Sequence, residues 1–145
     1  LKKKLDWAAQ LHEIGNLISH TDSHKHGAYI IENTDTPGFA KHELQRLSLL
    51  VLGHKGKLRK LDIDFEDEHL VCQLLSLRLA VILCHARREP DNTSVRLSKS
   101  SDLSRCFDLR VEPLWSQRFP QSTHLLQQEV LSWQKTSWKL RLLIS

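Results

Sequence analysis

The chain has 145 residues, of which 40% are hydrophobic and 26% are charged. These values are typical of one globular domain, alone or with a small second domain, and they argue against a disordered chain. The formal net charge of +4 permits an anionic partner without establishing one. No segment is long and apolar enough to predict a membrane span, and no signal peptide is visible.

The first predicted element is an amphipathic helix over residues 1–19, where Leu11, Ile14 and Ile18 continue an apolar spacing of three and four residues. The sequence contains no Met, and this pattern is helical from its first residue without an N-cap. We therefore expect a piece of a longer protein. A polar loop, SHTDSHKHG, leads to a short predicted helix at about residues 24–33, and NTDTPGF predicts a turn.

The next helix is predicted to begin near Lys41. Leu47, Val51 and His54 share one face of it, which places His54 at the inner C-terminal end. After a polar connector, the longest helix is expected over about residues 65–87.

The cysteines argue against a zinc site, because the three of them are widely spaced and form no C-x-x-C pair. Cys72 and Cys84 fall in the apolar run of the longest predicted helix, where we expect buried thiols. Reduced thiols fit a reducing, cytoplasmic compartment.

The polar stretch RREPDNTS, residues 87–94, predicts a domain boundary. After it, alternating apolar residues predict strands at 95–98, 107–111 and 138–144, with a helix at 121–134 between the last two. Trp115 falls in a stretch with no regular pattern. The sequence therefore predicts a mainly α protein, with a helical domain at residues 1–90 and a small β-β-α-β (α+β) domain at residues 91–145.

Histidines are concentrated near the start of the chain. His12-Glu13 matches the start of the helical zinc pattern H-E-x-x-H, but Asn16 stands where the second His is required, which excludes that site. One interpretation of the pair is the helical His-Asp centre of HD-type metal phosphohydrolases, with Glu13 in place of the Asp. The other is a structural role for His12, packed against the next helix.

The group His20, His24, Lys25 and His26 precedes a helix, so its cationic side chains and the free N–H groups of the helix start predict a phosphate site. The basic run at residues 55–60 is positioned to extend this surface if the helices pack that way. The alternative is a solvated loop without a ligand. A nucleic-acid-binding module is a further alternative for a basic chain, although no helix-turn-helix spacing is present and the tryptophans do not interleave with the basic run.

Two stretches resemble the C-terminal region of the exopolyphosphatase / guanosine pentaphosphate phosphohydrolase family. They are WAAQLHEIGNLISHTDSHKHGAYIIENTDTPGF at residues 7–39 and LSLLVLGHKGK at residues 47–57. The resemblance is strong over about residues 5–60 and only architectural in the predicted β-β-α-β tail. It implies an HD-like helical domain followed by a small α/β domain.

The resemblance also implies that catalysis belongs to two N-terminal actin-like domains, which bind phosphate and a divalent metal such as Mg²⁺ and lie outside this chain. The whole enzyme would hydrolyse terminal phosphoanhydride bonds of polyphosphate or guanosine pentaphosphate by in-line attack of water. The resemblance implies a substrate channel, a homodimer, no specific nucleic acid, and no catalytic residue, metal or cofactor in this fragment. The residues that match recurrent family positions, with an implied binding or architectural role, are His12, Glu13, His20, His24, Lys25, His26, Tyr29, His54 and Lys55.

Overall fold

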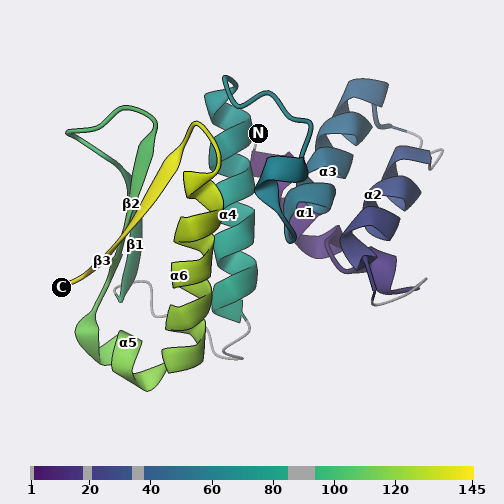
Figure 1. Ribbon diagram of the computed structural model, residues 1–145. Coiled ribbons are helices and arrows are strands. Elements are labelled where there is room, and N and C mark those ends of the chain that lie inside the picture. Colours follow the sequence, from purple (N-terminus) through teal and green to yellow (C-terminus); the bar gives the residue numbers. More distant parts are fainter. Residues whose placement is uncertain (1, 18–20, 34–37, 85–93) are drawn as a thin grey trace. The chain divides into compact units, whose positions relative to one another are not determined.

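A computed structural model describes residues 2–17, 21–33, 38–84 and 94–145 (Figure 1). The chain divides into two compact units, one of residues 1–56 and 61–78 and the other of residues 57–60 and 79–145. The predicted domain boundary at residues 87–94 falls almost entirely outside the described residues, so it stays a prediction. In the part of the chain that the structure describes, no helix is both long and apolar enough to cross a membrane.

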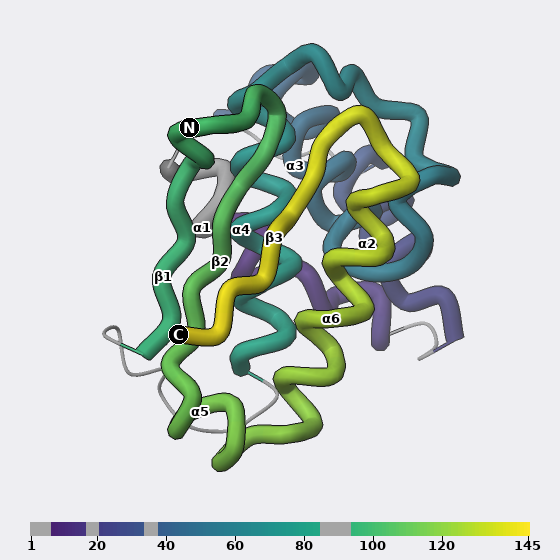
Figure 2. Tube along the Cα trace, turned by 60° about the vertical axis from the view of Figure 1, so that its left-hand side comes forward, coloured from purple at the N-terminus to yellow at the C-terminus, as the bar shows by residue number. Residues whose placement is uncertain are grey.

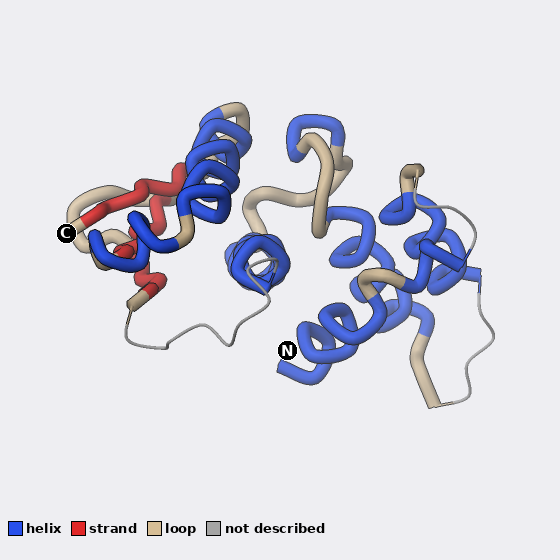
Figure 3. Tube along the Cα trace, turned by 90° about the horizontal axis from the view of Figure 1, so that it is seen from below, coloured by secondary structure: helices blue, strands red, loops and turns tan. Residues whose placement is uncertain are grey.

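The described elements of the first unit are helical (Figure 3). In chain order they are α1 (Lys2–Leu11), the 3-10 helix η1 (Ile14–Leu17), α2 (Ser23–Asn33), α3 (Lys41–Gly53) and most of α4 (Glu68–Cys84). α2 packs against both η1 and α3, and α1 packs against α3. The helices predicted near residues 24–33 and from Lys41 are confirmed, as is the long helix that contains Leu70 and Leu74.

The single helix predicted for residues 1–19 is wrong. α1 ends at Leu11, a turn follows at His12-Glu13, and η1 begins at Ile14. The reason is a close approach at Gly15, where an added Cβ would lie only 1.7 Å from the carbonyl oxygen of Ser23. The turn brings the glycine against the first turn of α2, a contact that the local apolar spacing does not reveal.

The starts of α3 and α4 are fixed by acidic side chains. Glu43 accepts a hydrogen bond from the backbone N–H of Ala40 at 3.2 Å, and Asp67 accepts one from the N–H of Leu70 at 3.2 Å. These bonds satisfy amide groups that have no partner within the helix. Arg46 of α3 also contacts Asp67 at 2.9 Å, which ties α3 to the start of α4.

The prediction of buried thiols in α4 is wrong. Cys72 and Cys84 are both exposed, whereas Leu70 and Leu74 are 3% and 1% exposed. Each helical residue turns the side chain by about 100°, so Cys72 points about 200° away from Leu70, on the opposite face. Cys106, in the second unit, is the buried cysteine.

The second unit contains a three-stranded sheet with α6 packed against β3 (Figure 1, Figure 2). Its elements are the 3-10 helix η2 (Leu58–Lys60), the end of α4, β1 (Val95–Lys99), β2 (Cys106–Val111), α5 (Pro113–Arg118), α6 (Pro120–Gln134) and β3 (Lys139–Ile144). The strand order is β1-β2-β3, with β1 antiparallel and β3 parallel to β2. Leu97, Leu109 and Leu142 are aligned across the sheet.

The predicted strands and the predicted helix of this tail are confirmed. The predicted β-β-α-β order omitted one helix, α5, which lies between β2 and α6. Trp115, predicted to lie in an irregular stretch, is in α5 and is only 8% exposed. α5 is six residues long and is followed by Pro120, so it is too short to show a helical repeat. The architecture is therefore mainly helical with a small mixed sheet.

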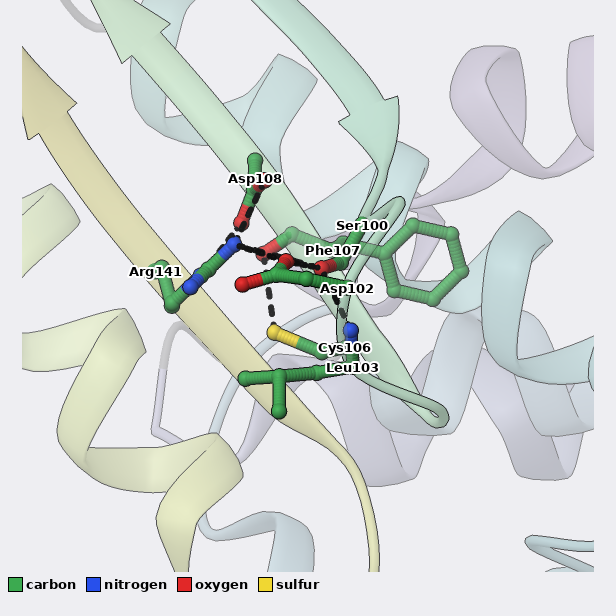
Figure 4. Close-up of polar contacts among 7 residues, drawn as sticks. All are labelled: Ser100, Asp102, Leu103, Cys106, Phe107, Asp108 and Arg141. Carbon is green, nitrogen blue, oxygen red and sulfur yellow. Dashed lines mark hydrogen bonds and ion pairs between the residues drawn. The ribbon is translucent and has the colours of Figure 1, made fainter.

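A polar cluster fixes the hairpin between β1 and β2 to β3 (Figure 4). The guanidinium of Arg141 donates to both carboxylate oxygens of Asp108 at 2.6 and 2.9 Å, and to Asp102 at 3.0 Å. Ser100 donates to Asp102 at 2.6 Å and accepts the N–H of Leu103 at 3.2 Å. The donors and acceptors of the cluster satisfy one another, which indicates a structural role.

Candidate functional site

The candidate site lies in the first unit, where the turn after α1, the start of α2 and the end of α3 meet. His12 is in the turn, and its Nδ1 lies within hydrogen-bond distance of the carbonyl oxygen of Ala9. A carbonyl can only accept, so Nδ1 carries the proton and Nε2 is unprotonated in the neutral ring. Glu13 follows it, 3.9 Å from His12 Nε2, with a side chain that is 76% exposed.

α2 carries the second group of predicted residues in its first turn. Asp22 precedes the helix in the left-handed region, with φ of 54°, and its carbonyl oxygen accepts the N–H groups of Lys25 and His26. The ammonium group of Lys25 lies 3.8 Å from the Asp22 carboxylate at the surface. His26 is half-buried, and Tyr29 is 67% exposed. Asp22, Lys25 and His26 therefore make the start of α2 polar.

His54 follows the last residue of α3 and is 5% exposed, which confirms its predicted inner position. Its Nδ1 lies 2.5 Å from the carbonyl oxygen of Val51, so this ring is also protonated at Nδ1. Arg78 of α4, itself 6% exposed, donates to the carbonyl oxygen of Gly53 at 2.7 Å and to that of Gly56 at 3.1 Å. The end of α3 is thereby closed by a buried cation, which the helix dipole favours.

Three rings form what we call the imidazole cluster, made of His12, His24 and His54. The His12 and His54 rings meet edge to face with centroids 5.1 Å apart, and those of His24 and His54 with centroids 6.4 Å apart. Burial is the main cause that lowers the pKa of His54 to about 4. The hydrogen bond to Val51 acts in the opposite direction, to raise the pKa, but is the smaller effect. Burial and then the charge of Lys55 lower the pKa of His24. The two rings are therefore neutral near pH 7.

Gly56 lets the backbone pass over the His24 ring. Its φ is +87°, and a Cβ there would lie 3.2 Å from His24 Nε2. The other ring nitrogen of His24, Nδ1, is buried and has no hydrogen-bond partner among the described residues. Lys55, between His54 and Gly56, is exposed and brings a cation to the surface beside the cluster.

The described side chains of the site do not form a group typical of a hydrolytic metal centre. No group of three His, Cys, Asp or Glu side chains that could hold a metal ion occurs within residues 2–17, 21–33, 38–84 and 94–145. Mg²⁺ prefers an octahedral set of oxygen ligands, whereas the grouped side chains here are imidazoles with two exposed carboxylates near them, Asp22 and Glu13. The described residues therefore do not fit a magnesium ion. The imidazole cluster instead provides ring packing and hydrogen bonds from ring nitrogens to backbone carbonyl groups.

The structure brings together only part of the predicted set. His12, His24 and His54 meet, with Lys55 beside them, while Glu13 and Tyr29 are exposed. His20 lies outside the described residues, and residues 57–60 belong to the second unit, so the extended basic surface stays a prediction.

Sequence reasoning missed Arg78 and Gly15. A lone Arg inside the apolar run LLSLRLAVILC is the signal that could have identified the first, because a buried guanidinium needs acceptors. For Gly15 the sequence gives no comparable signal, since only the fold reveals its neighbour.

Comparisons with known proteins identify the relatives of this sequence. Residues 1–132 match the family model described as Ppx/GppA phosphatase, domain III. The chain is 36% identical over 135 residues to a protein of Pseudoalteromonas translucida named guanosine-5'-triphosphate,3'-diphosphate pyrophosphatase, covering 91% of this chain and 27% of that protein. A protein of the same name from Aeromonas hydrophila is 30% identical over 143 residues, covering 96% of this chain and 28% of its own length.

These findings correct the expectation of an HD-like domain. The matched family model is that of domain III, and it runs through both compact units rather than the helical part alone. The described residues also lack the metal-binding group on which an HD-type centre depends. The interpretation of His12-Glu13 as part of such a centre is therefore not favoured. The structure favours the alternative of a packed, backbone-bonded His12.

Proposed function

The chain belongs to the Ppx/GppA phosphatase family, and we propose that it serves as a non-catalytic module of a phosphohydrolase that cleaves terminal phosphoanhydride bonds. The observation that carries the proposal is the match of residues 1–132 to domain III, together with the span of the chain, about 27% of the length of the curated relatives. The activity then depends on parts of the enzyme beyond these residues.

Guanosine pentaphosphate is the substrate that the comparisons favour over polyphosphate, because both relatives described above are named as guanosine-5'-triphosphate,3'-diphosphate pyrophosphatases. Both substrates carry anionic phosphate groups, so both require a binding surface with cationic side chains and hydrogen-bond donors. We propose a homodimer and no specific nucleic-acid partner, as the family resemblance implies, and a cytoplasmic location, which fits reduced cysteines.

The binding surface we propose is the start of α2 together with Lys55. At neutral pH the buried His54 ring has no proton on Nε2, so it donates no hydrogen bond there to a phosphate oxygen. Lys25 and Lys55 are exposed and supply permanent cations, with His26 beside Lys25. The imidazole cluster then has an architectural role, since it holds the backbone segments that carry these side chains.

Metal chemistry in the whole enzyme is assigned by this proposal to other domains. Mg²⁺ would there offset the charge that develops on the transferred phosphoryl group. This chain contributes cations and shape, because its described side chains do not include the carboxylate set that such an ion requires.

The test is a phosphate-release assay on the purified chain with guanosine pentaphosphate, with and without Mg²⁺ and Mn²⁺. We expect no release above the buffer rate under either condition. Metal-dependent turnover by this chain alone would contradict the proposal and favour an autonomous metal phosphohydrolase. Salt-sensitive binding to single- or double-stranded nucleic acid in preference to guanosine pentaphosphate would also contradict it.

A further inference from the structure

The imidazole cluster joins three segments that are far apart in the chain. His12 comes from the turn after α1, His24 from the first turn of α2, and His54 from the end of α3. His54 is the central ring, since it contacts both of the others, and it is 5% exposed. A change in the charge of this ring therefore changes the interactions that hold the three segments together.

The groups that face His54 are cationic or become cationic on protonation. Lys55 follows it in the chain, His12 and His24 face it from the other two segments, and all three act to lower its pKa. From α4, Arg78 binds the carbonyl oxygens of Gly53 and Gly56, which flank His54 and Lys55.

The acids near the cluster lie at its edge. Asp22 raises the pKa of His24, but Lys55, Lys25 and Arg78 act against it. Glu13 approaches His12 Nε2 only to 3.9 Å, and its side chain is 76% exposed. The charged or chargeable groups with the largest effects on His54 are His12, Lys55 and His24, and neither carboxylate is one of them. Among the described residues, these neighbours therefore offer a proton on the central ring no counter-charge.

We propose that the imidazole cluster is an acid-sensitive switch, in which a proton on His54 separates the end of α3 from the His12 turn and from the start of α2. The Nδ1–H of His54 is committed to Val51, so a proton from solvent enters at Nε2 and makes the ring a cation. That cation is buried against the His12 and His24 rings, and the next residue in the chain, Lys55, adds a further positive charge. Opening of the junction hydrates the ring and relieves the repulsion.

The expected size of the effect follows from linkage. In the opened form His54 regains an ordinary pKa of about 6.5, against about 4 in the closed form, so the opening equilibrium increases by about 20-fold between pH 7 and pH 5. The sign is fixed, because the form with the higher pKa is favoured as the pH falls.

The experiment is amide hydrogen exchange on the full chain at pH 7 and pH 5, corrected for the intrinsic exchange rates. We expect protection in α2 and in the last turn of α3 to fall by about 20-fold, with α6 unaffected. In His54→Asn the side-chain amide is placed to keep the bond to Val51 but cannot take up the proton, so most of the fall should disappear. His42→Asn, an exposed position on the same helix, is the matched control and should behave as wild type.

Two results overturn the proposal. One is an equal loss of protection in wild type and His54→Asn, and the other is no loss in wild type. If His54→Asn does not fold, the wild-type protein still decides, through titration of the histidine ring protons by NMR. A His54 pKa below 5 supports the switch, and a value of 5 or above overturns it.

Discussion

Replacement of Gly15 by alanine tests the packing that organises the first unit. The added Cβ would lie 1.7 Å from the carbonyl oxygen of Ser23 and 2.6 Å from the amide nitrogen of Gly27, both backbone atoms in α2. Restoring an ordinary contact of 3.4 Å requires a shift of about 1.7 Å (3.4 minus 1.7) between η1 and α2. Such a shift also disturbs Gly27, whose Cβ position lies 3.0 Å from Val51.

Overpacking in a core costs about 1 to 3 kcal/mol when side chains can adjust, so we expect Gly15→Ala to cost about 3 kcal/mol or more, because backbone must move. Urea unfolding followed by circular dichroism measures the loss, and amide exchange in α2 and α6 separates the two units. Gly38→Ala is the control, because it meets nothing within 4 Å and carries only the strain of a φ of +91°, worth about 1 to 2 kcal/mol. The reasoning would be refuted if Gly15→Ala were as stable as wild type, or if its free energy of unfolding were no lower than that of Gly38→Ala.

Three further outcomes are expected. His54 should make stability depend on pH. Its pKa is lowered to about 4 in the folded chain, so the unfolded chain binds the proton more tightly, and the unfolding free energy between pH 6.5 and 4 should fall by about 3 kcal/mol more in wild type than in His54→Asn. Leu126→Ala, at a fully buried position of α6, should cost about 2 to 5 kcal/mol in the second unit and leave exchange in α2 unchanged. Arg78→Met should cost about 1 to 3 kcal/mol in urea unfolding, because the carbonyl groups of Gly53 and Gly56 lose their buried donor, and equal stability would contradict this.

The local sequence pattern was sufficient to predict an element whose own residues carry the signal. Successive side chains of a strand point to opposite faces of the sheet, so apolar residues alternate, and Leu109 and Val111 are buried as that alternation requires. The face shared by Leu47, Val51 and His54 is likewise buried. Burial in α4 was overestimated because apolar residues occupy most of its circumference, so sequence alone did not distinguish the outward face of Cys72.

The site was predictable in composition but not in geometry. The sequence placed His12 within a helix predicted for residues 1–19 and His54 at a helix end, yet their contact depends on the turn at residues 12–13. That turn depends on Gly15 meeting Ser23, a tertiary contact. The neutral state of His54 could not be predicted either, since the pKa of an imidazole is set by its burial and neighbours.

Calorimetric titration of the chain with guanosine pentaphosphate, after chelation of metals and at two salt concentrations, tests the central claim most directly. Lys25→Ala/Lys55→Ala removes the two exposed cations of the proposed surface, and Lys41→Ala/Lys135→Ala removes the same charge from exposed positions elsewhere. The proposal predicts micromolar binding that weakens by about tenfold or more for each lysine lost in the first variant and persists in the second. Absence of binding by the wild-type chain, or equal binding by both variants, would contradict the account.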